Sequence, residues 1–577
     1  MNQNKRKATM KWMVGGVLCI VLSIGLYSFN DDKKNFDIVK NLDIFYNVFR
    51  ELNTYYVDDT NPEKLIKKGI DEMLGSLDPY TTFIPESEME DFKFMTTGEY
   101  AGIGSLISKI DDYVVIAEPY EGFPAQQAGL KSGDRILSID GVSMEKKNTS
   151  DVSNRLKGAA NTTLKIKIDR PGVKKPMEIE LTRKSIQINA VPYYGMMNDQ
   201  TGIIILNNFT QDCSREVEKA FLDLKEKQNA RKIILDLRGN PGGLLDEAIK
   251  IVNLFVPKGS EIVSTRGKVK QWDKTYSATS QPIDTIMPIA VLINRGSASA
   301  SEIVAGALQD LDRAVIIGQR SFGKGLVQAT RNLAYNTKLK VTTAKYYIPS
   351  GRCIQAVDYS HRNEDGSVGY VPDSLISEYK TRVGRKVFDG GGVSPDIKVP
   401  TERYSNITFA LVTQQLLFKY ATQFCLSNPT IPSPTAFEIT DATYGEFKSF
   451  VASQKDFKYE SRSQEMLKKL KETAEREEYY KASEKEFEAL ENMLKLDVKK
   501  DLDLFAPEIK ELLSLELMRR YYYQKGAIQF GLRNDKELKE AINTLNSIDQ
   551  YNGLLTGAIL SHAGDKRMSK FEKEDEE

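Results

Sequence analysis

The chain of 577 residues is too long for one hydrophobic core, and its 41% hydrophobic and 28% charged residues exclude a mostly disordered or fibrous protein. Its 80 basic and 80 acidic residues cancel, so no global positive field exists to hold nucleic acid, and no nucleic-acid partner is expected. Four cysteines are too few for a disulfide scaffold, and only two histidines, His361 and His562, exclude a histidine-rich metal site.

Residues 1–34 are predicted to form a membrane anchor or signal segment. Lys5, Arg6, Lys7 and Lys11 precede an apolar run over residues 12–29, whose 18 residues approach the ~20 needed to span a bilayer. Because positive residues retain their end of such a segment in the cytoplasm, the rest of the chain is expected outside. No Ala-x-Ala-like cleavage site follows, which favours an uncleaved anchor over a cleaved signal peptide. We therefore expect a single-pass inner-membrane protein with its bulk on the periplasmic, extracytoplasmic side.

Residues 35–90 are predicted to be helical, because apolar residues recur near helical spacing from Phe36 to Leu74. The turn formers Asp78, Pro79 and Tyr80 interrupt this pattern.

Residues 91–187 have a β-rich pattern in place of the helical one. Short β-rich runs (113–117, 135–139, 164–168 and 177–181) alternate with turn clusters, and one helix is expected over 150–156. This block is predicted to be a small β domain.

Residues 188–400 alternate strand-like apolar runs with amphipathic helical stretches. The strands are expected over 203–206, 232–237, 289–293 and 314–317, and the helices near 214–225, 244–255 and 299–311. This alternation predicts a mostly parallel sheet with helices on its faces, followed by an antiparallel stretch over 338–348.

Residues 401–577 are helical by pattern and end in a polar tail. The segment 468–500 is dense in Glu and Lys at i,i+4 spacing, which is typical of a solvated helix face, with a partner-binding surface as the alternative. The predicted fold class is thus multidomain α+β: an N-terminal anchor, a helical segment, a β domain, an α/β core and a C-terminal all-α region.

Ser299 lies between a predicted strand and a predicted helix. Ser299 and Glu302 stand at capping-box spacing, so the simplest interpretation is that Ser299 caps the helix. The same geometry suits catalysis. A hydroxyl at a helix N-terminus lies beside unpaired backbone N–H groups and the positive end of the dipole, where an oxyanion is stabilised.

The segment Ser321-Phe322-Gly323-Lys324-Gly325 makes the catalytic interpretation attractive. A Lys held between glycines in a poorly solvated pocket loses its proton more easily, and a neutral Lys can deprotonate a Ser without any histidine. Residues 318–324 also match the first seven positions of a phosphate-binding P-loop. The eighth position is Gly325 instead of Ser or Thr, and residues 326–330 look extended, so nucleotide binding is not favoured.

A glycine cluster, residues 238–243, follows the strand over 232–237. Its backbone N–H groups can point at a developing negative charge, although an ordinary strand-to-helix turn explains the sequence equally well.

Together, residues 296–310, the Phe-Gly-Lys-Gly segment and Gln328 resemble the carboxyl-terminal processing proteases, tail-specific Ser–Lys peptidases of family S41 that carry a PDZ domain. The resemblance covers about residues 35–400. It implies that Ser299 is the nucleophile, Lys324 the general base and Gln328 the residue that orients the Lys amine. It also implies an oxyanion hole made by the N–H groups of Ala300 and of the Gly242–Gly243 turn. Ser297, Ser301, Gln309 and Asp310 are implied to be structural.

The β domain resembles a PDZ module, with a carboxylate-binding loop over residues 100–104. The resemblance implies that Gly102, Ile103, Gly104 and Leu106 bind a peptide, whose C-terminal carboxylate meets backbone N–H groups while its chain adds as a strand. The resemblance to the family does not extend to residues 401–577, for which oligomerisation and substrate guidance both stay open.

The function expected from this resemblance is a serine endopeptidase that recognises protein C-termini and cleaves or degrades exported proteins. Its expected partners are proteins or peptides with apolar C-termini and the membrane, with a homo-oligomer or an adaptor protein as further candidates. No metal and no organic cofactor is expected. The alternative is a catalytically inactive PDZ-based adaptor of the cell envelope.

Overall fold

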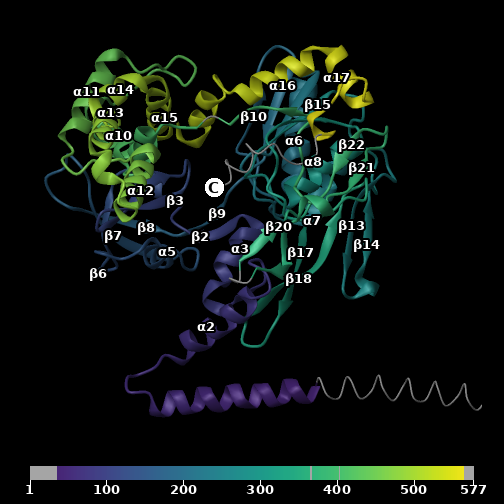
Figure 1. Cartoon of the computed structure of the whole chain (residues 1–577), viewed down its shortest axis with the longest axis horizontal. Helices are drawn as coiled ribbons and strands as arrows, with labels where there is room; N and C mark the ends of the chain where they lie inside the picture. The colour runs from purple at the N-terminus through teal and green to yellow at the C-terminus, as the bar shows by residue number, and fades with distance from the viewer. Residues whose placement is uncertain (1–34, 364–366, 402, 565–577) are drawn as a thin grey trace, which may run out of the picture. The chain divides into compact units, whose positions relative to one another are not determined.

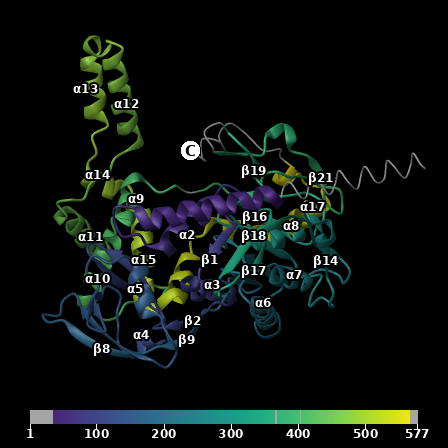
Figure 2. The same ribbon diagram turned by 90° about the horizontal axis from the view of Figure 1, so that it is seen from below.

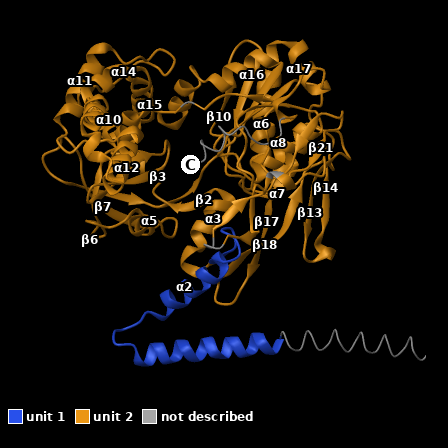
Figure 3. Cartoon of the chain, viewed as in Figure 1, with its two compact units in different colours: residues 1–83 blue, residues 84–577 orange. Residues whose placement is uncertain are grey.

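The computed structural model describes residues 35–363, 367–401 and 403–564. It divides into two compact units, residues 1–83 and 84–577, which Figure 3 colours separately. The anchor predicted over residues 1–34 lies outside the described residues. None of the helices that the structure describes combines the length and the apolar character needed to cross a bilayer.

The first unit is helical, as predicted. Residues 35–55 form one helix and α2 (Pro62–Gly75) a second, with Pro62 in its first turn and the Asn61 side chain accepting a hydrogen bond from the Lys64 N–H. The predicted break follows. The Asp78 carboxylate accepts the N–H groups of Tyr80 and Thr81, both at 2.8 Å, and so stabilises a turn in place of a further helical turn. A short strand, β1 (Thr82–Ile84), lies at the boundary between the two units.

The second unit begins with α3 (Met89–Thr97) and the β domain. The principal sheet of this domain has the order β3-β4-β5-β7-β8, built from β3 (Ser105–Ile110), β4 (Tyr113–Pro119), β5 (Arg135–Ile139), β7 (Thr163–Asp169) and β8 (Met177–Thr182), with β6 (Val142–Ser143) beside β5. Two short helices, α4 (Pro124–Gln127) and α5 (Thr149–Leu156), pack on it, and β2 (Glu99–Gly102) pairs with β9 (Lys184–Gln187). In β7 buried residues alternate with exposed ones, as the period of two along a strand requires.

The α/β core contains a six-stranded sheet in the order β10-β11-β12-β15-β16-β23. Its strands are β10 (Tyr193–Met196), β11 (Thr201–Ile205), β12 (Lys232–Asp236), β15 (Ile289–Ile293), β16 (Val315–Gly318) and β23 (Ile397–Lys398). Only the β10–β11 pair is antiparallel. The mostly parallel sheet predicted from the strand–helix alternation is confirmed.

Both faces of this sheet are buried. On one face Ile289, Val291 and Ile293 pack against α6 (Cys213–Leu222), α7 (Leu245–Asn253) and α8 (Ala300–Asp310). The alternate residues of the same strand, Ala290 and Leu292, belong to a separate apolar cluster that includes Leu538 and Leu545. That cluster comes from α16 (Lys536–Asn546) and α17 (Ile548–Thr556), which cover the second face (Figure 1).

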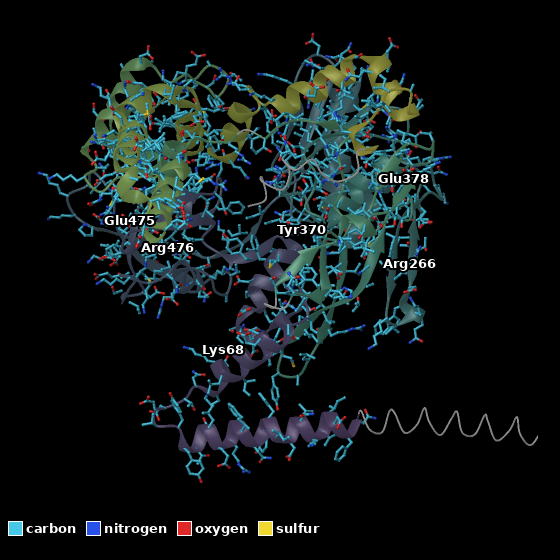
Figure 4. The ribbon with its side chains drawn as sticks, in the orientation of Figure 1. Lys68, Arg266, Tyr370, Glu378, Glu475 and Arg476 are labelled. Carbon is cyan, nitrogen blue, oxygen red and sulfur yellow. The ribbon has the colours of Figure 1, made fainter. Side chains whose placement is uncertain are left out.

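An antiparallel sheet adjoins the core. Strand β18 (Lys338–Tyr347) lies between β13 (Glu261–Gly267) and β17 (Leu326–Asn332), and β14 (Lys274–Ser277) pairs with β13. The Arg266 guanidinium of β13, labelled in Figure 4, lies 4.5 Å from the centre of the Tyr347 ring. Two small hairpins follow, β19–β20 (Val357–Arg362 and Val368–Tyr370) and β21–β22 (Glu378–Lys380 and Lys386–Phe388). The chain after Lys324 enters β17 and not a helix, which confirms the prediction that residues 318–324 are not a P-loop.

The C-terminal helices form a bundle with its own apolar core. Its members are α9 (Asn406–Thr413), α10 (Leu416–Ser427), α11 (Asp441–Ser453), α14 (Val498–Leu504) and α15 (Ala506–Gly531). Helices α12 (Arg462–Arg476) and α13 (Glu484–Met493) project from it as a pair (Figure 2), held by a small cluster around Leu467 and Phe487. Glu475 and Arg476, labelled in Figure 4, are exposed, as expected of a solvated face.

Helices α16 and α17 belong to the α/β core by packing, although sequence analysis grouped them with the other C-terminal helices. Leu538, Leu545 and Tyr551 are each at most 4% exposed, and the Tyr551 hydroxyl accepts a hydrogen bond from the Ile289 N–H at 3.0 Å. A sheet with helices on both faces needs two helical layers, and α16 and α17 form the second one.

Candidate active site

Ser299 is the N-cap residue of α8, at the carboxyl end of β15, and has the backbone angles φ 56° and ψ −111°. A positive φ is uncommon for any residue other than glycine, and such strain concentrates at functional sites. Two neighbouring serines hold the turn in place. The Ser297 hydroxyl donates to the Leu237 carbonyl at 2.8 Å, and the Ser301 hydroxyl donates to the Asn240 carbonyl at 2.9 Å. Of the three serines, these two are occupied by hydrogen bonds to the scaffold.

Glu302 joins the Ser299 turn to the loop that carries Lys324. One carboxylate oxygen of Glu302 accepts the Ser299 N–H at 2.7 Å and the Lys324 N–H at 2.9 Å. The other accepts the Ser321 hydroxyl at 2.6 Å and the Gly323 N–H at 2.7 Å. The predicted capping box between Ser299 and Glu302 is present, but the same carboxylate also holds the loop over residues 321–324, which lies 19 to 22 residues further along the chain.

A second group spans the same two segments. The Tyr346 hydroxyl, on β18, contacts the backbone carbonyl oxygens of both Ser299, at 3.1 Å, and Lys324. Ser299 and Lys324 therefore share a carboxylate oxygen on their N–H groups and a phenol on their carbonyl groups. Their backbones are neighbours, as a Ser–Lys dyad requires.

Glu302 is completely buried, and this burial raises the pKa of its carboxyl group to about 7. The hydrogen bond from Ser321 and those from the backbone N–H groups act in the opposite direction, because they stabilise the charged form. Four hydrogen-bond donors from the Ser299 turn and the Lys324 loop thus face this carboxyl group, which ties its ionisation to the geometry of these two segments.

The turn over residues 239–243 packs directly against Ser299. A Cβ at Gly242, where φ is 98°, would lie 2.7 Å from the Ala298 oxygen and 2.9 Å from the Ala300 nitrogen. At Gly243 a Cβ would lie 2.3 Å from the Phe209 oxygen. Only glycine fits at these two positions, because any side chain would overlap backbone atoms.

The same turn corrects part of the predicted oxyanion hole. The Gly242 N–H donates to Asn240 Oδ1 at 2.9 Å and is not available to a substrate in this conformation. The Ala300 and Gly243 N–H groups make no hydrogen bond to any of the described residues. These two N–H groups, at the N-terminus of α8 and in the turn beside it, can receive an oxyanion.

Gln328 lies on β17, four residues after Lys324. Its side-chain amide is within hydrogen-bonding distance of the Leu326 carbonyl, at 3.3 Å, and of the Thr342 hydroxyl, at 3.2 Å. These contacts fix the side chain in position beside the Lys324 loop. Its role toward the Lys324 amine stays a prediction.

The histidines lie elsewhere. The His361 side chain is 86% exposed and pairs with Asp358. His562 Nδ1 lies 3.2 Å from the Asp396 carbonyl oxygen.

Gln309 and Asp310, implied to be structural, both accept hydrogen bonds from the fully buried Arg352, each at 2.8 Å.

Arg238 anchors the glycine turn to the C-terminal helices. Its guanidinium pairs with Asp236 at 2.6 Å, with Asp535 at 2.6 Å and with Glu537 at 2.5 Å. Arg238 immediately precedes Gly239, and Glu537 lies in the first turn of α16. The N-terminus of α16 therefore holds Arg238, next to the turn that carries the candidate oxyanion donor Gly243.

A pocket of about 180 Å³ lies in the β domain where the carboxylate loop was predicted. Gly102, Ile103 and Leu106 line it, and Leu106 is 52% exposed. Gly104 shapes the loop beside it, with φ 72° and a carbonyl that accepts the Tyr120 N–H at 2.9 Å. The remaining lining residues are Phe94, Tyr100, Ser105, Ile107, Tyr120, Ser153, Leu156 and Lys157.

The sequence predicted only a capping role for Glu302 and none for Tyr346. Glu302 carried a signal, since it stands at the third position of a helix whose cap is Ser299. For Tyr346 the sequence holds no comparable signal, because its hydroxyl contacts two segments that are distant from it in the chain.

Comparison with protein-family models finds three matches along the chain. Peptidase family S41 matches residues 200–360, a PDZ domain matches residues 115–170, and the C-terminal helical domain of a probable PDZ-protease matches residues 407–545.

Two relatives show how much of the chain is shared. The carboxy-terminal-processing protease of Bartonella bacilliformis is 40% identical over 342 residues, which are 59% of this chain and 76% of that protein. The probable CtpA-like serine protease of Staphylococcus aureus strain COL is 31% identical over 418 residues, 70% of this chain and 76% of that protein. Among solved structures, the photosystem II D1 C-terminal processing protease is 29% identical with a TM-score of 0.34, over 62% of this chain and 92% of its own.

Proposed function

The chain belongs to peptidase family S41, the carboxy-terminal-processing serine peptidases, and on that basis we propose that Ser299 and Lys324 form its catalytic dyad. The observation that carries the proposal is the pair of shared partners. Glu302 accepts both N–H groups, and the Tyr346 hydroxyl contacts both carbonyl groups.

In the proposed reaction, the neutral Lys324 amine takes the proton of the Ser299 hydroxyl as Ser299 Oγ attacks the scissile carbonyl carbon. The N–H groups of Ala300 and Gly243 receive the negative charge that develops on the carbonyl oxygen. The Lys324 ammonium then returns a proton to the leaving amine, and the acyl-enzyme remains on Ser299. A water molecule, deprotonated by the same amine, hydrolyses this ester and regenerates the dyad.

The pocket of the PDZ domain is proposed to receive the C-terminus of the substrate. Apolar and aromatic side chains line it, and the adjoining loop carries backbone N–H groups at Gly104 and Ser105, which the Tyr100 hydroxyl engages in this structure and which a carboxylate would take over. The substrate class is therefore proteins or peptides with apolar C-termini. The apolar run over residues 12–29 supports an inner-membrane anchor with the peptidase on the extracytoplasmic side, where exported proteins would be its substrates.

The test uses an unfolded reporter protein with an apolar C-terminus and compares the wild type with Ser299→Ala and Lys324→Ala. Both variants are expected to lose at least 1,000-fold in kcat/KM, because each removes one member of a unit, while binding of the reporter persists. Equal degradation by all three proteins would refute the dyad. If the wild type binds the reporter and leaves it intact, the protein is instead a PDZ-based adaptor.

Gln328 provides a separate prediction. Gln328→Ala is expected to lower kcat by roughly tenfold with little change in KM, if its amide positions the Lys324 amine. The matched control is Thr342→Val, which removes the partner hydroxyl of Gln328 on β18 and leaves the amide in place. The measurement is kcat and KM of both variants by steady-state kinetics. An equal loss in both would mean that Gln328 acts only through the β17–β18 pairing.

A further inference from the structure

Helix α3 precedes the PDZ domain and contributes a wall to its pocket. Phe94 of α3 lines the pocket, and its ring meets the Tyr100 ring edge-on, with 5.2 Å between the ring centres. Residue 94 lies outside residues 115–170, the part matched by the PDZ family model. Residues 100–107 of the lining also precede that part, but Phe94 is the lining residue that comes from α3, the helix before the β domain.

The helix is held on two sides. Asp91 and Phe94, three residues apart, share one face of α3, and Asp91 pairs with Lys157, which also lines the pocket. Phe92 and Thr96, four residues apart, share another face, which meets the peptidase core. There the Lys338 amine lies 6.0 Å from the centre of the Phe92 ring, and the Gln211 N–H donates to the Thr96 carbonyl at 2.9 Å. Phe94 is thus fixed relative to both the PDZ domain and the core.

The dimensions of the pocket suit one side chain. Its volume of about 180 Å³ lies below the roughly 300–1,000 Å³ of sites that enclose small-molecule ligands. Aromatic and aliphatic groups line most of it, and Lys157 is the one charged residue among the described lining. Such a pocket accepts an apolar side chain at the end of a peptide, and its walls limit the size of that side chain.

We infer that Phe94 is a specificity-determining residue for the peptidase, which sets the size of the terminal side chain that the pocket admits. This inference rests on the proposed function, because it requires that substrates enter the pocket by their C-terminal residue. Removing the ring enlarges the pocket, so large terminal side chains gain contacts while small ones lose a wall. A larger ring at the same position has the opposite effect.

The experiment measures the Kd of peptides that are identical except for a terminal Ala, Leu or Trp, by fluorescence anisotropy on the full chain carrying Ser299→Ala, which prevents cleavage. Phe94→Ala is expected to change the ratio of the Kd values for the Ala and Trp peptides by about tenfold in favour of Trp. Phe94→Trp is expected to change this ratio by a similar factor in favour of Ala. One methylene group more or less in a hydrophobic pocket changes the discrimination between ligands by roughly 10- to 200-fold.

Phe92→Ala is the matched control, since Phe92 lies on the same helix but faces the core, and it should leave the ratio unchanged. Equal Kd changes for all three peptides in the Phe94 variants, or the same shift in Phe92→Ala, would overturn the inference. Amidated peptides distinguish a failure of the proposed docking of C-termini from a failure of the role of Phe94 alone. If the wild type does not distinguish free from amidated C-termini, the proposed docking of C-termini is wrong and this inference falls with it. If it does distinguish them and the Phe94 variants keep the wild-type ratio, only this inference fails.

Discussion

Glu302→Gln is expected to lower kcat by roughly 100-fold and to leave KM nearly unchanged. The carboxylate of Glu302 accepts four hydrogen bonds, two on each oxygen. A glutamine amide has one acceptor oxygen, and its NH₂ group would face two donors. Each buried donor left without a partner costs about 1–3 kcal/mol, so the loop carrying Lys324 shifts. A displacement of about 1 Å in a catalytic group lowers the rate by about this factor. Steady-state kinetics on the reporter measure both constants.

Glu247→Gln is the matched control for this variant. Glu247 is 2% exposed and accepts the Ser214 N–H at 2.9 Å, so it is also a buried carboxylate that holds a backbone donor. It holds neither Ser299 nor Lys324. Thermal unfolding of both variants should show comparable destabilisation, whereas only Glu302→Gln should lose kcat. Equal losses of kcat would show that Glu302 matters through stability alone.

The titration of Glu302 predicts a pH dependence of stability. Its pKa of about 7 in the folded protein lies above the value of 4.5 expected for an exposed glutamic acid. Between these values the folded state binds the proton more tightly than the unfolded chain does, so stability from this group is fully present below pH 4.5 and is lost as pH rises through about 7. The loss over the whole window is roughly 3 kcal/mol. The stability of Glu302→Gln relative to the wild type should therefore increase between pH 5 and pH 8, as followed by chemical denaturation of the core. A difference that does not change with pH would contradict this assignment.

Leu545→Ala is expected to destabilise the peptidase core by about 2–5 kcal/mol, although residue 545 lies more than 140 residues beyond β23. Leu545 is 1% exposed and packs in the cluster that contains Leu292 and Ile317 of the central sheet. Removing its side chain leaves a cavity between α16 and that sheet. The test is the free energy of unfolding from urea denaturation. Peptidase activity serves as the probe of the folded core.

Leu470→Ala is the control, since Leu470 also lies on a C-terminal helix but is 55% exposed on α12. It should change the stability of the core by less than about 0.5 kcal/mol. If Leu545→Ala left the loss of activity at the same urea concentration as in the wild type, α16 would not be part of the folding unit that contains the active site.

Strong local patterns led from the sequence to most of the elements that position the site. The apolar run 289–293 became β15, the stretch 299–311 became α8, and the extended appearance of residues 326–330 correctly excluded the helix that a P-loop needs. Each of these predictions depends on residues within one strand or a few helical turns, where hydrophobic period and capping act directly. The resemblance to the family then assigned roles to Ser299 and Lys324, a choice that composition could not make among three closely spaced serines.

The folded chain settled what depends on contacts between distant segments. Capping-box spacing identified Glu302 as a partner of Ser299. The hydrogen bonds that Glu302 accepts from the Gly323 and Lys324 N–H groups arise from the packing of α8 against the loop before β17. The Gly242 N–H donates to Asn240, which leaves Gly243 and Ala300 of the three predicted oxyanion donors. This hydrogen bond depends on the conformation of the turn, which its composition does not specify. Helices α16 and α17 were grouped with the helices before them, because the hydrophobic period of a helix shows only that one face is buried. It does not show which surface buries that face. That choice is made by the second apolar face of the central sheet, which α16 and α17 bury and which no local pattern in residues 532–564 can describe.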